Sequence, residues 1–186
     1  MEPKRIFTGV VQLVVTAVTM LLFMSACGWL FDRDPRTVES TPALFLDNSD
    51  LPEGWIVTSP PSKPYTSAYD FAVALMDPAI GPSNPPGARL EITKLRSPEG
   101  ADRHYNGQLL LPTQYKKAPE GFTAYPQKAD AYRLGCDPFR IYLHCLYKAR
   151  YGAYTVDLAV SMNQLTAAAD LTKMINAIER RLGSSP

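Results

Sequence analysis

Histidine and cysteine are both scarce in this chain of 186 residues, which contains two histidines and three cysteines. The histidines, His104 and His144, lie far apart in the sequence, and neither a Gly-x-Ser-x-Gly turn nor a Gly-x-x-x-x-Gly-Lys loop is present. The usual signals of an activated nucleophile and of a phosphate-cradling loop are therefore missing. The carboxylates Asp70, Glu91 and Asp157 fall on different predicted strands. We expect no enzyme, no cofactor, no metal site and no buried cluster of three or more ionisable side chains.

Net charge is also nearly absent, since 19 Lys and Arg face 18 Asp and Glu and the formal charge is +1. Glu2, Lys4 and Arg5 are the charged residues of the first 26 positions, so the remainder of the chain is neutral. A neutral chain has no global field that would recruit a polyanion. We expect no nucleic-acid partner.

A long apolar run stands at the amino end, where residues 6–23 follow Lys4 and Arg5. A basic start followed by an apolar stretch is typical of an export signal. The next residues, Met24, Ser25, Ala26 and Cys27, resemble the lipobox of bacterial lipoproteins, although Met24 stands where that family usually has Leu. The resemblance implies that residues 1–26 are a cleaved signal peptide and that the Cys27 thiol receives lipid, with fatty acids such as palmitate.

The same apolar run has an alternative interpretation as an uncleaved membrane anchor, because a spanning helix needs about 20 apolar residues. In both interpretations Lys4 and Arg5 hold the amino end in the cytoplasm, so everything after Cys27 lies outside it. The lipoprotein interpretation predicts a lipid anchor in the cell membrane or outer membrane. It implies two partners, the bilayer through acylated Cys27 and another protein of the cell envelope.

The other two cysteines, Cys136 and Cys145, stand at the ends of the stretch "CDPFRIYLHC". A pair outside the cytoplasm predicts a disulfide, and closing so short a loop contributes about 2.5 to 3 kcal/mol in the chain-entropy model. Two free thiols and a metal site that uses His144 are the alternatives. Zinc sites usually have four ligands, whereas only these three candidates are close in sequence.

The sequence divides into a signal peptide (1–26), a lipidated flexible tether (27–42), one globular domain (43–183) and a short tail (184–186). Pattern and turn residues predict strands at 55–59, 68–76, 88–95, 129–135, 141–150 and 154–162. Pro60, Pro61 and Pro64 are expected to break the chain after the first strand. Helices are predicted at 98–110, with Ser97 as N-cap, and from Thr166 to a stop at Gly183.

These elements predict an α+β domain, an antiparallel sheet of about six strands in the order β-β-β-α-β-β-β-α with helices packed on the sheet. The last two strands are expected to form a hairpin through Tyr151 and Gly152. The layout loosely resembles the sandwich shared by PsbP-type proteins and Mog1, a likeness of architecture that implies no activity. We place His104 on the solvent-facing side of the first helix.

Two features could bind a partner. The long connection 111–128 carries aromatic and cationic residues, Tyr115, Lys116, Lys117, Phe122 and Tyr125. Long connections are often functional, although Phe122 and Tyr125 could instead fold back over the edge of the sheet. The strand at 141–150 presents a second set, Tyr142, His144, Leu146, Lys148 and Arg150, which would lie either exposed or beneath a helix.

These observations favour a non-enzymatic envelope lipoprotein that binds another protein or helps to assemble a complex. The alternative is a sensor or carrier that holds a small ligand in a cleft between sheet and helix. A carrier should have an enclosed pocket, whereas a protein-binding module should have an exposed apolar or aromatic patch.

Overall fold

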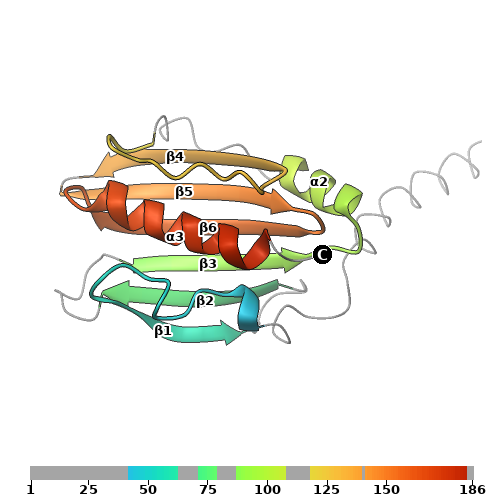
Figure 1. The fold of residues 1–186 in the computed structure, drawn as a ribbon, viewed down its shortest axis with the longest axis horizontal. Helices are drawn as coiled ribbons and strands as arrows, with labels where there is room; N and C mark the ends of the chain where they lie inside the picture. Colours follow the sequence, from blue (N-terminus) through green and yellow to red (C-terminus); the bar gives the residue numbers. More distant parts are fainter. Residues whose placement is uncertain (1–41, 63–70, 79–86, 108–117, 140, 184–186) are drawn as a thin grey trace, which may run out of the picture. The chain divides into compact units, whose positions relative to one another are not determined.

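Six antiparallel strands form one sheet in the order β1-β2-β3-β6-β5-β4 (Figure 1). This computed structural model describes residues 42–62, 71–78, 87–107, 118–139 and 141–183, which belong to one compact unit. The elements are η2 (Pro42–Leu44), β1 (Trp55–Ser62), β2 (Phe71–Pro78), β3 (Gly87–Lys94), α2 (Pro98–Gly107), β4 (Ala131–Phe139), β5 (Tyr142–Tyr151), β6 (Tyr154–Asn163) and α3 (Ala167–Leu182). The predicted fold class is confirmed.

The sheet consists of two three-stranded meanders that join along β3 and β6. Their register places Leu90 opposite Leu158 and Ile92 opposite Val156, and all four side chains are buried. Because side chains alternate between the faces of a strand, this register sets the apolar residues of both strands on the same face. That face is the core of the domain.

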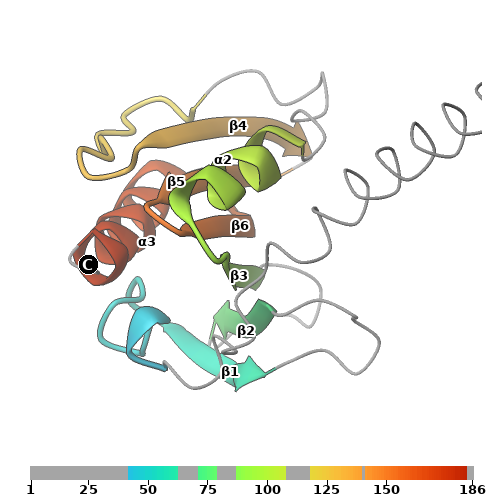
Figure 2. The ribbon, with the colours of Figure 1, turned by 90° about the vertical axis from the view of Figure 1, so that its right-hand side faces the viewer.

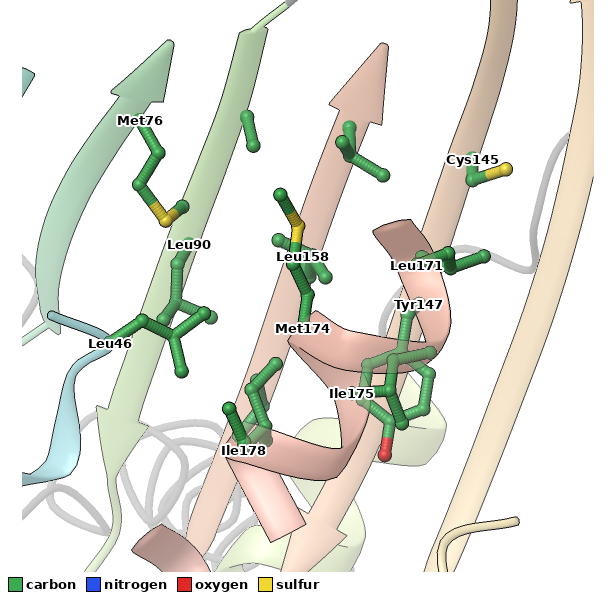
Figure 3. Packing of buried hydrophobic residues seen from close by; sticks show 14 of the residues in the cluster. Leu46, Met76, Leu90, Cys145, Tyr147, Leu158, Leu171, Met174, Ile175 and Ile178 are labelled. Carbon is green, nitrogen blue, oxygen red and sulfur yellow. The ribbon is translucent and has the colours of Figure 1, made fainter. Parts of the chain in front are cut away.

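α3 covers the core face with an apolar stripe at three- and four-residue spacing. Figure 3 shows Leu171, Met174, Ile175 and Ile178 between the helix and the sheet, and these side chains are at most 1% exposed. Each such side chain contributes about 1.5 to 3 kcal/mol when it is fully buried. The stripe therefore fixes α3 on this face of the sheet.

α2 lies on the opposite face of the sheet, which we call the back face (Figure 2). It contacts β5 and β6 through residues such as Arg150 and Thr155, which alternate with core residues. The helix begins as predicted, since the Ser97 hydroxyl accepts a hydrogen bond from the Gly100 N–H at 3.1 Å. The structure describes it as far as Gly107, so the predicted extension to residue 110 lies outside the described residues.

Residues 43–54 flank α3 and are held to its carboxyl-terminal end by an ionic clamp. The guanidinium of Arg181 donates to Asp50 at 2.6 Å, to Asp47 at 2.5 Å and to the Ala43 carbonyl at 2.9 Å. Arg180 adds a bond to Asp50 at 3.0 Å. We call these contacts the Arg181 clamp. It docks the apolar residues of this segment on the core, among them Phe45, Leu46 and Leu51.

Strand β1 differs from the prediction because it continues through Pro60 and Pro61 to Ser62. Among the described strands β2 is the one neighbour of β1, which is thus an edge strand, so a proline there need not remove a ladder hydrogen bond. Its register shifts between Val57 and Ser59 and again between Ser59 and Ser62. The prolines therefore distort this edge without ending the strand. Pro64 lies outside the described residues.

The second meander agrees with the predicted hairpin and cysteine pair. Gly152 adopts a φ of +54°, which favours glycine, and Tyr151 pairs with Tyr154 across the turn. On β4 and β5, Cys136 lies directly opposite Cys145 with 2.03 Å between the sulfur atoms, consistent with the predicted disulfide. The bridge lies on the core face, where both residues are buried.

Candidate functional site

The predicted binding connection is described only in its second half. Phe122 is partly buried and packs against the core, whereas Tyr125 is 72% exposed. For Phe122 the structure thus favours the fold-back alternative. Outside the described residues lie Cys27 and three residues of the predicted surface, Tyr115, Lys116 and Lys117.

Tyr125 belongs to an aromatic pair beside strand β4. Its ring meets the Tyr132 ring edge-on, with 6.1 Å between the centroids and 78° between the planes. Tyr132 is itself 36% exposed and lies 6.3 Å from the buried ring of Tyr147. The pair therefore continues the core outward to a solvent-exposed aromatic surface at the β4 edge.

A hollow of about 350 Å³ occupies the part of the back face between β2 and β5. Strands β3, β5 and β6 form its floor, and small residues such as Gly87 and Ala159 leave the space. Leu75 is 43% exposed at its rim, so the hollow opens to solvent. We call it the back-face hollow, and the side chains that reach it are Leu75, Arg89, His144, Leu146, Ala159 and Ser161.

The chemistry of the back-face hollow is apolar with a basic rim. The described residues that line it include one arginine and one histidine, Arg89 and His144, and none of them is acidic. The hydroxyl oxygen of Ser161 is buried in the floor and has no hydrogen-bond partner among the described residues. The hollow thus suits an apolar group that carries a negative charge or a hydrogen-bonding oxygen.

A row of ion pairs borders the hollow across the middle of the back face. Glu91 accepts from Arg89 at 2.7 Å on β3, and Lys148 of β5 lies 2.7 Å from Asp157 of β6. The register places Glu91 directly opposite Asp157, which brings the two carboxylates together. Their side chains are 15% and 20% exposed, and that of Lys148 is 20% exposed.

The carboxyl group of Glu91 is perturbed by its surroundings in this row. Burial raises its pKa, with a smaller contribution from the negative charge of Asp157, while Arg89 acts in the opposite direction. Each carboxylate nevertheless faces a cation at 2.7 Å. The row is therefore a balanced network of two acids and two bases, as expected of charges that are partly removed from water.

The row assembles residues that the sequence places on separate strands, but its side chains are only partly buried, so the expectation of no buried cluster of three or more ionisable side chains is not contradicted. Glu91 and Asp157 come together although they belong to different meanders, and three ionisable side chains cluster in partly buried positions. The alternation of charged with apolar residues on β3 and β6 was visible in the sequence. The pairing of β3 with β6 was not visible in the sequence, because it depends on the tertiary topology.

α2 covers the back face where β5 ends and β6 begins, through polar contacts. Asp102 lies 3.5 Å from Arg150, and the Arg133 guanidinium stacks 4.8 Å from the centre of the Tyr105 ring. His104 Nδ1 shares a hydrogen bond of 3.0 Å with the buried hydroxyl of Thr155. The prediction that His104 faces solvent is therefore wrong, because the helix turns this side chain toward the sheet.

The set predicted on strand 141–150 is divided among three regions of the back face. Arg150 lies beneath α2, Lys148 belongs to the ion-pair row, and His144 and Leu146 line the back-face hollow. Both alternatives for this set thus apply, each to one end of β5. The sequence correctly identified the strand and the residues that share its back face, but not which of these residues α2 covers.

A second groove, of about 600 Å³, follows the solvent side of α3. Small and polar residues line it, including Ala168, Thr172 and Asn176, with Leu165 at 94% exposure near the start of the helix. Lys173 and Arg180 make its rim basic as well, but none of its described lining residues has a buried polar atom without a partner, as Ser161 has in the back-face hollow. We therefore take the back-face hollow as the candidate site.

Comparison with protein-family models, with curated proteins and with solved structures found no match. Within residues 42–183, gaps excepted, no helix is long and apolar enough to cross a membrane. The same residues contain no group of three or more His, Cys, Asp or Glu side chains that could hold a metal ion.

Proposed function

We propose that this protein is a lipoprotein of the cell envelope, anchored through acylated Cys27, whose domain binds another protein at the back-face hollow. The occupant is a segment that presents an apolar side chain beside an acidic group. The observation that carries the proposal is the hollow itself, an open apolar depression with Arg89 and His144 at its rim and no acid among the described residues that line it. The guanidinium of Arg89 has several N–H donors, so it can bind the acidic group of the occupant while it stays paired with Glu91.

The count of cysteines in the chain supports the anchor. Cys136 and Cys145 lie at disulfide distance from each other, which leaves Cys27 as the remaining cysteine of the chain. Disulfides persist outside the cytoplasm, in agreement with the export signal. One cysteine with several acyl chains holds a protein more firmly than a single chain would.

The shape of the hollow distinguishes protein binding from ligand carriage. A carrier encloses most of its ligand, whereas Leu75 and Arg89 leave this site open, with 43% of Leu75 and 48% of the Arg89 side chain exposed. An open apolar patch is the feature expected of a protein-binding surface. An enzyme is not favoured, because the carboxylates nearest the hollow are each neutralised by a cation.

The anchor is tested with Cys27→Ala in the full-length protein. We expect the variant to lose its lipid and either to leave the membrane fraction or to keep its signal peptide. Fractionation and the mass of the amino-terminal peptide measure both results. Normal processing with undiminished membrane retention would refute the lipid anchor.

The hollow is tested by photo-crosslinking in intact cells. A photoreactive amino acid in place of Leu75 should give a discrete protein adduct, and the same amino acid in place of the exposed Glu53 should not. Ala159→Phe fills the hollow and should abolish the adduct at position 75. Adducts with small molecules alone would favour the carrier, and equal adducts at both positions would refute the site.

A further inference from the structure

The β4 edge of the sheet is built differently from the β1 edge. Among the described strands β5 is the one neighbour of β4, and all nine residues of β4 pair with it in continuous register from Ala131 to Phe139 (Figure 1). It has none of the register shifts that distort β1. A long, regular edge strand presents unpaired backbone groups to which another strand can bond.

The cysteine pair identifies which backbone groups point outward. Antiparallel partners alternate between hydrogen-bonded pairs, about 5.5 Å apart at Cα, and non-hydrogen-bonded pairs, about 4.5 Å apart. Cys136 and Cys145 are 4.1 Å apart at Cα and are therefore a non-hydrogen-bonded pair. By alternation, the N–H and C=O groups of Tyr132, Leu134 and Cys136 point away from β5. No hydrogen bond from these groups to another described residue occurs.

The side chains of β4 are complementary to a second copy of the same strand. If two copies run antiparallel about a twofold axis at Gly135, Arg133 of each lies opposite Asp137 of the other. On the other face Tyr132 meets Pro138, a contact between an aromatic and a proline ring. The outward backbone groups of Leu134 then meet those of Cys136, which is the phase that hydrogen bonding requires.

The two registers whose axis lies two residues from Gly135 are disfavoured by charge. A twofold axis at Arg133 would set two arginines opposite each other, and an axis at Asp137 would do the same with two aspartates. Like charges directly opposite each other destabilise a strand pair. Among the described residues Asp137 takes part in no ion pair, so it is available for an arginine from a second copy.

We propose that two copies of this protein associate through β4, antiparallel about Gly135, and form one continuous sheet. The inference goes beyond the proposed function, because the β4 edge and the back-face hollow are different surfaces. In an antiparallel edge-to-edge pair the twofold axis is perpendicular to the sheet. Both α3 helices therefore lie on one side of the dimer and both hollows on the other, where they stay open.

A covalent trap tests the register in the full-length protein, reconstituted in phosphatidylcholine vesicles. Under oxidising conditions Gly135→Cys should give a disulfide-linked dimer, because the two new cysteines are neighbours across the axis. Ala131→Cys is the matched control on the same face of the same strand. Its two copies would lie roughly 25 Å apart at the strand spacing and should not cross-link. Equal trapping at both positions, or at neither, would overturn the proposal.

Charge exchange tests the contacts without a new thiol. Asp137→Arg should raise the dissociation constant on the order of tenfold, because two symmetric attractions become repulsions. Arg133→Asp should do the same, and the double variant should restore the original constant to within about threefold. Sedimentation measures association in detergent, and thermal melting verifies folding.

Two further outcomes would contradict a dimer of this kind. One is a double variant that associates no better than either single variant. The other is a monomer whose β4 instead pairs with an extended segment of a different protein. Tyr132→Pro removes one outward N–H of β4 and so tests whether association needs backbone pairing. Tyr132→Ala keeps that N–H and removes the ring, so it tests whether association needs the ring contacts. Loss of association in the alanine variant only would overturn strand pairing.

Discussion

The core face of the sheet is apolar from β2 to β4, whereas the back face combines an ion-pair row, a helix held by polar contacts and an open hollow. The same strands make both faces, because successive residues point to opposite sides. Leu158 is 1% exposed on one side, while its neighbours Asp157 and Ala159 face the ion pairs and the hollow on the other. The core face carries the stability of the domain, which leaves the back face free to bind.

The strongest test of this comparison removes a large side chain from each face. Leu158→Ala should lower the free energy of unfolding by about 2 to 5 kcal/mol, because it leaves a cavity in a fully buried site. Leu146→Ala, on the half-buried back face, should cost about 1 kcal/mol or less. Urea denaturation measures both. Equal losses would mean that the back face is as important to stability as the core.

The disulfide on the core face should have the next largest effect. Replacing both Cys136 and Cys145 by Ala should lower the free energy of unfolding by about 2.5 kcal/mol, because the short loop is no longer closed in the unfolded chain. Denaturation of the double variant is compared with that of the reduced parent protein. If reduction leaves the parent unaffected, the bond contributes nothing to stability.

The Arg181 clamp at the margin of the core face should contribute somewhat less. Asp50 is 6% exposed and accepts hydrogen bonds from two arginines. Asp50→Ala should therefore cost about 1.5 to 3 kcal/mol, the range for hydrogen bonds to charged groups. Thermal unfolding measures the loss. The matched control is Asp170→Ala, whose exposed carboxylate bonds only Thr166 within the described structure and should matter little.

The smallest effects distinguish the two faces by the sign of their pH dependence. The Ser49 and Arg181 hydrogen bonds lower the pKa of Asp47 to about 2, so its stabilisation is complete above its ordinary value and disappears between about pH 4 and pH 2. Burial raises the pKa of Glu91, so its charge increasingly destabilises the fold as the pH rises through that pKa.

Two neutral variants check these signs. Asp47→Asn should lose more stability relative to the parent at pH 7 than at pH 2. Glu91→Gln should gain more, or lose less, at pH 7 than at pH 4. Urea titrations at each pH give the differences. Parallel curves for Glu91→Gln and the parent would mean that burial does not govern this carboxyl group.

Local patterns in the sequence predicted most of the elements. The alternation of residues 154–162, the Ser97 cap and the apolar stripe of α3 are set by neighbours a few positions away, and each appears where it was expected. The prolines led to a wrong prediction for the end of β1, because the effect of a proline depends on whether its strand has a neighbour on both sides. An edge position tolerates Pro60 and Pro61, and the sequence does not mark β1 as an edge.

The candidate site was only partly predictable because topology assembles it. His144 and Leu146 were recognised as a possible surface, but Leu75, Arg89 and Ser161 come from three other strands. Their meeting depends on β3 lying beside β6, a contact between meanders that are separated by a helix and a long connection. Sequence periodicity gives the face of each residue but not the order of the strands.

The Arg181 clamp has a mechanical consequence. Any tension that reaches the domain from before residue 42 arrives first at η2 and the segment after it, and there the guanidinium of Arg181 grips two carboxylates and the Ala43 carbonyl. These contacts transmit the force to α3, which packs on the core, before the force can separate the distorted strand β1 from β2. When the domain is pulled by its amino end, it should resist unfolding until the contacts of the Arg181 clamp break.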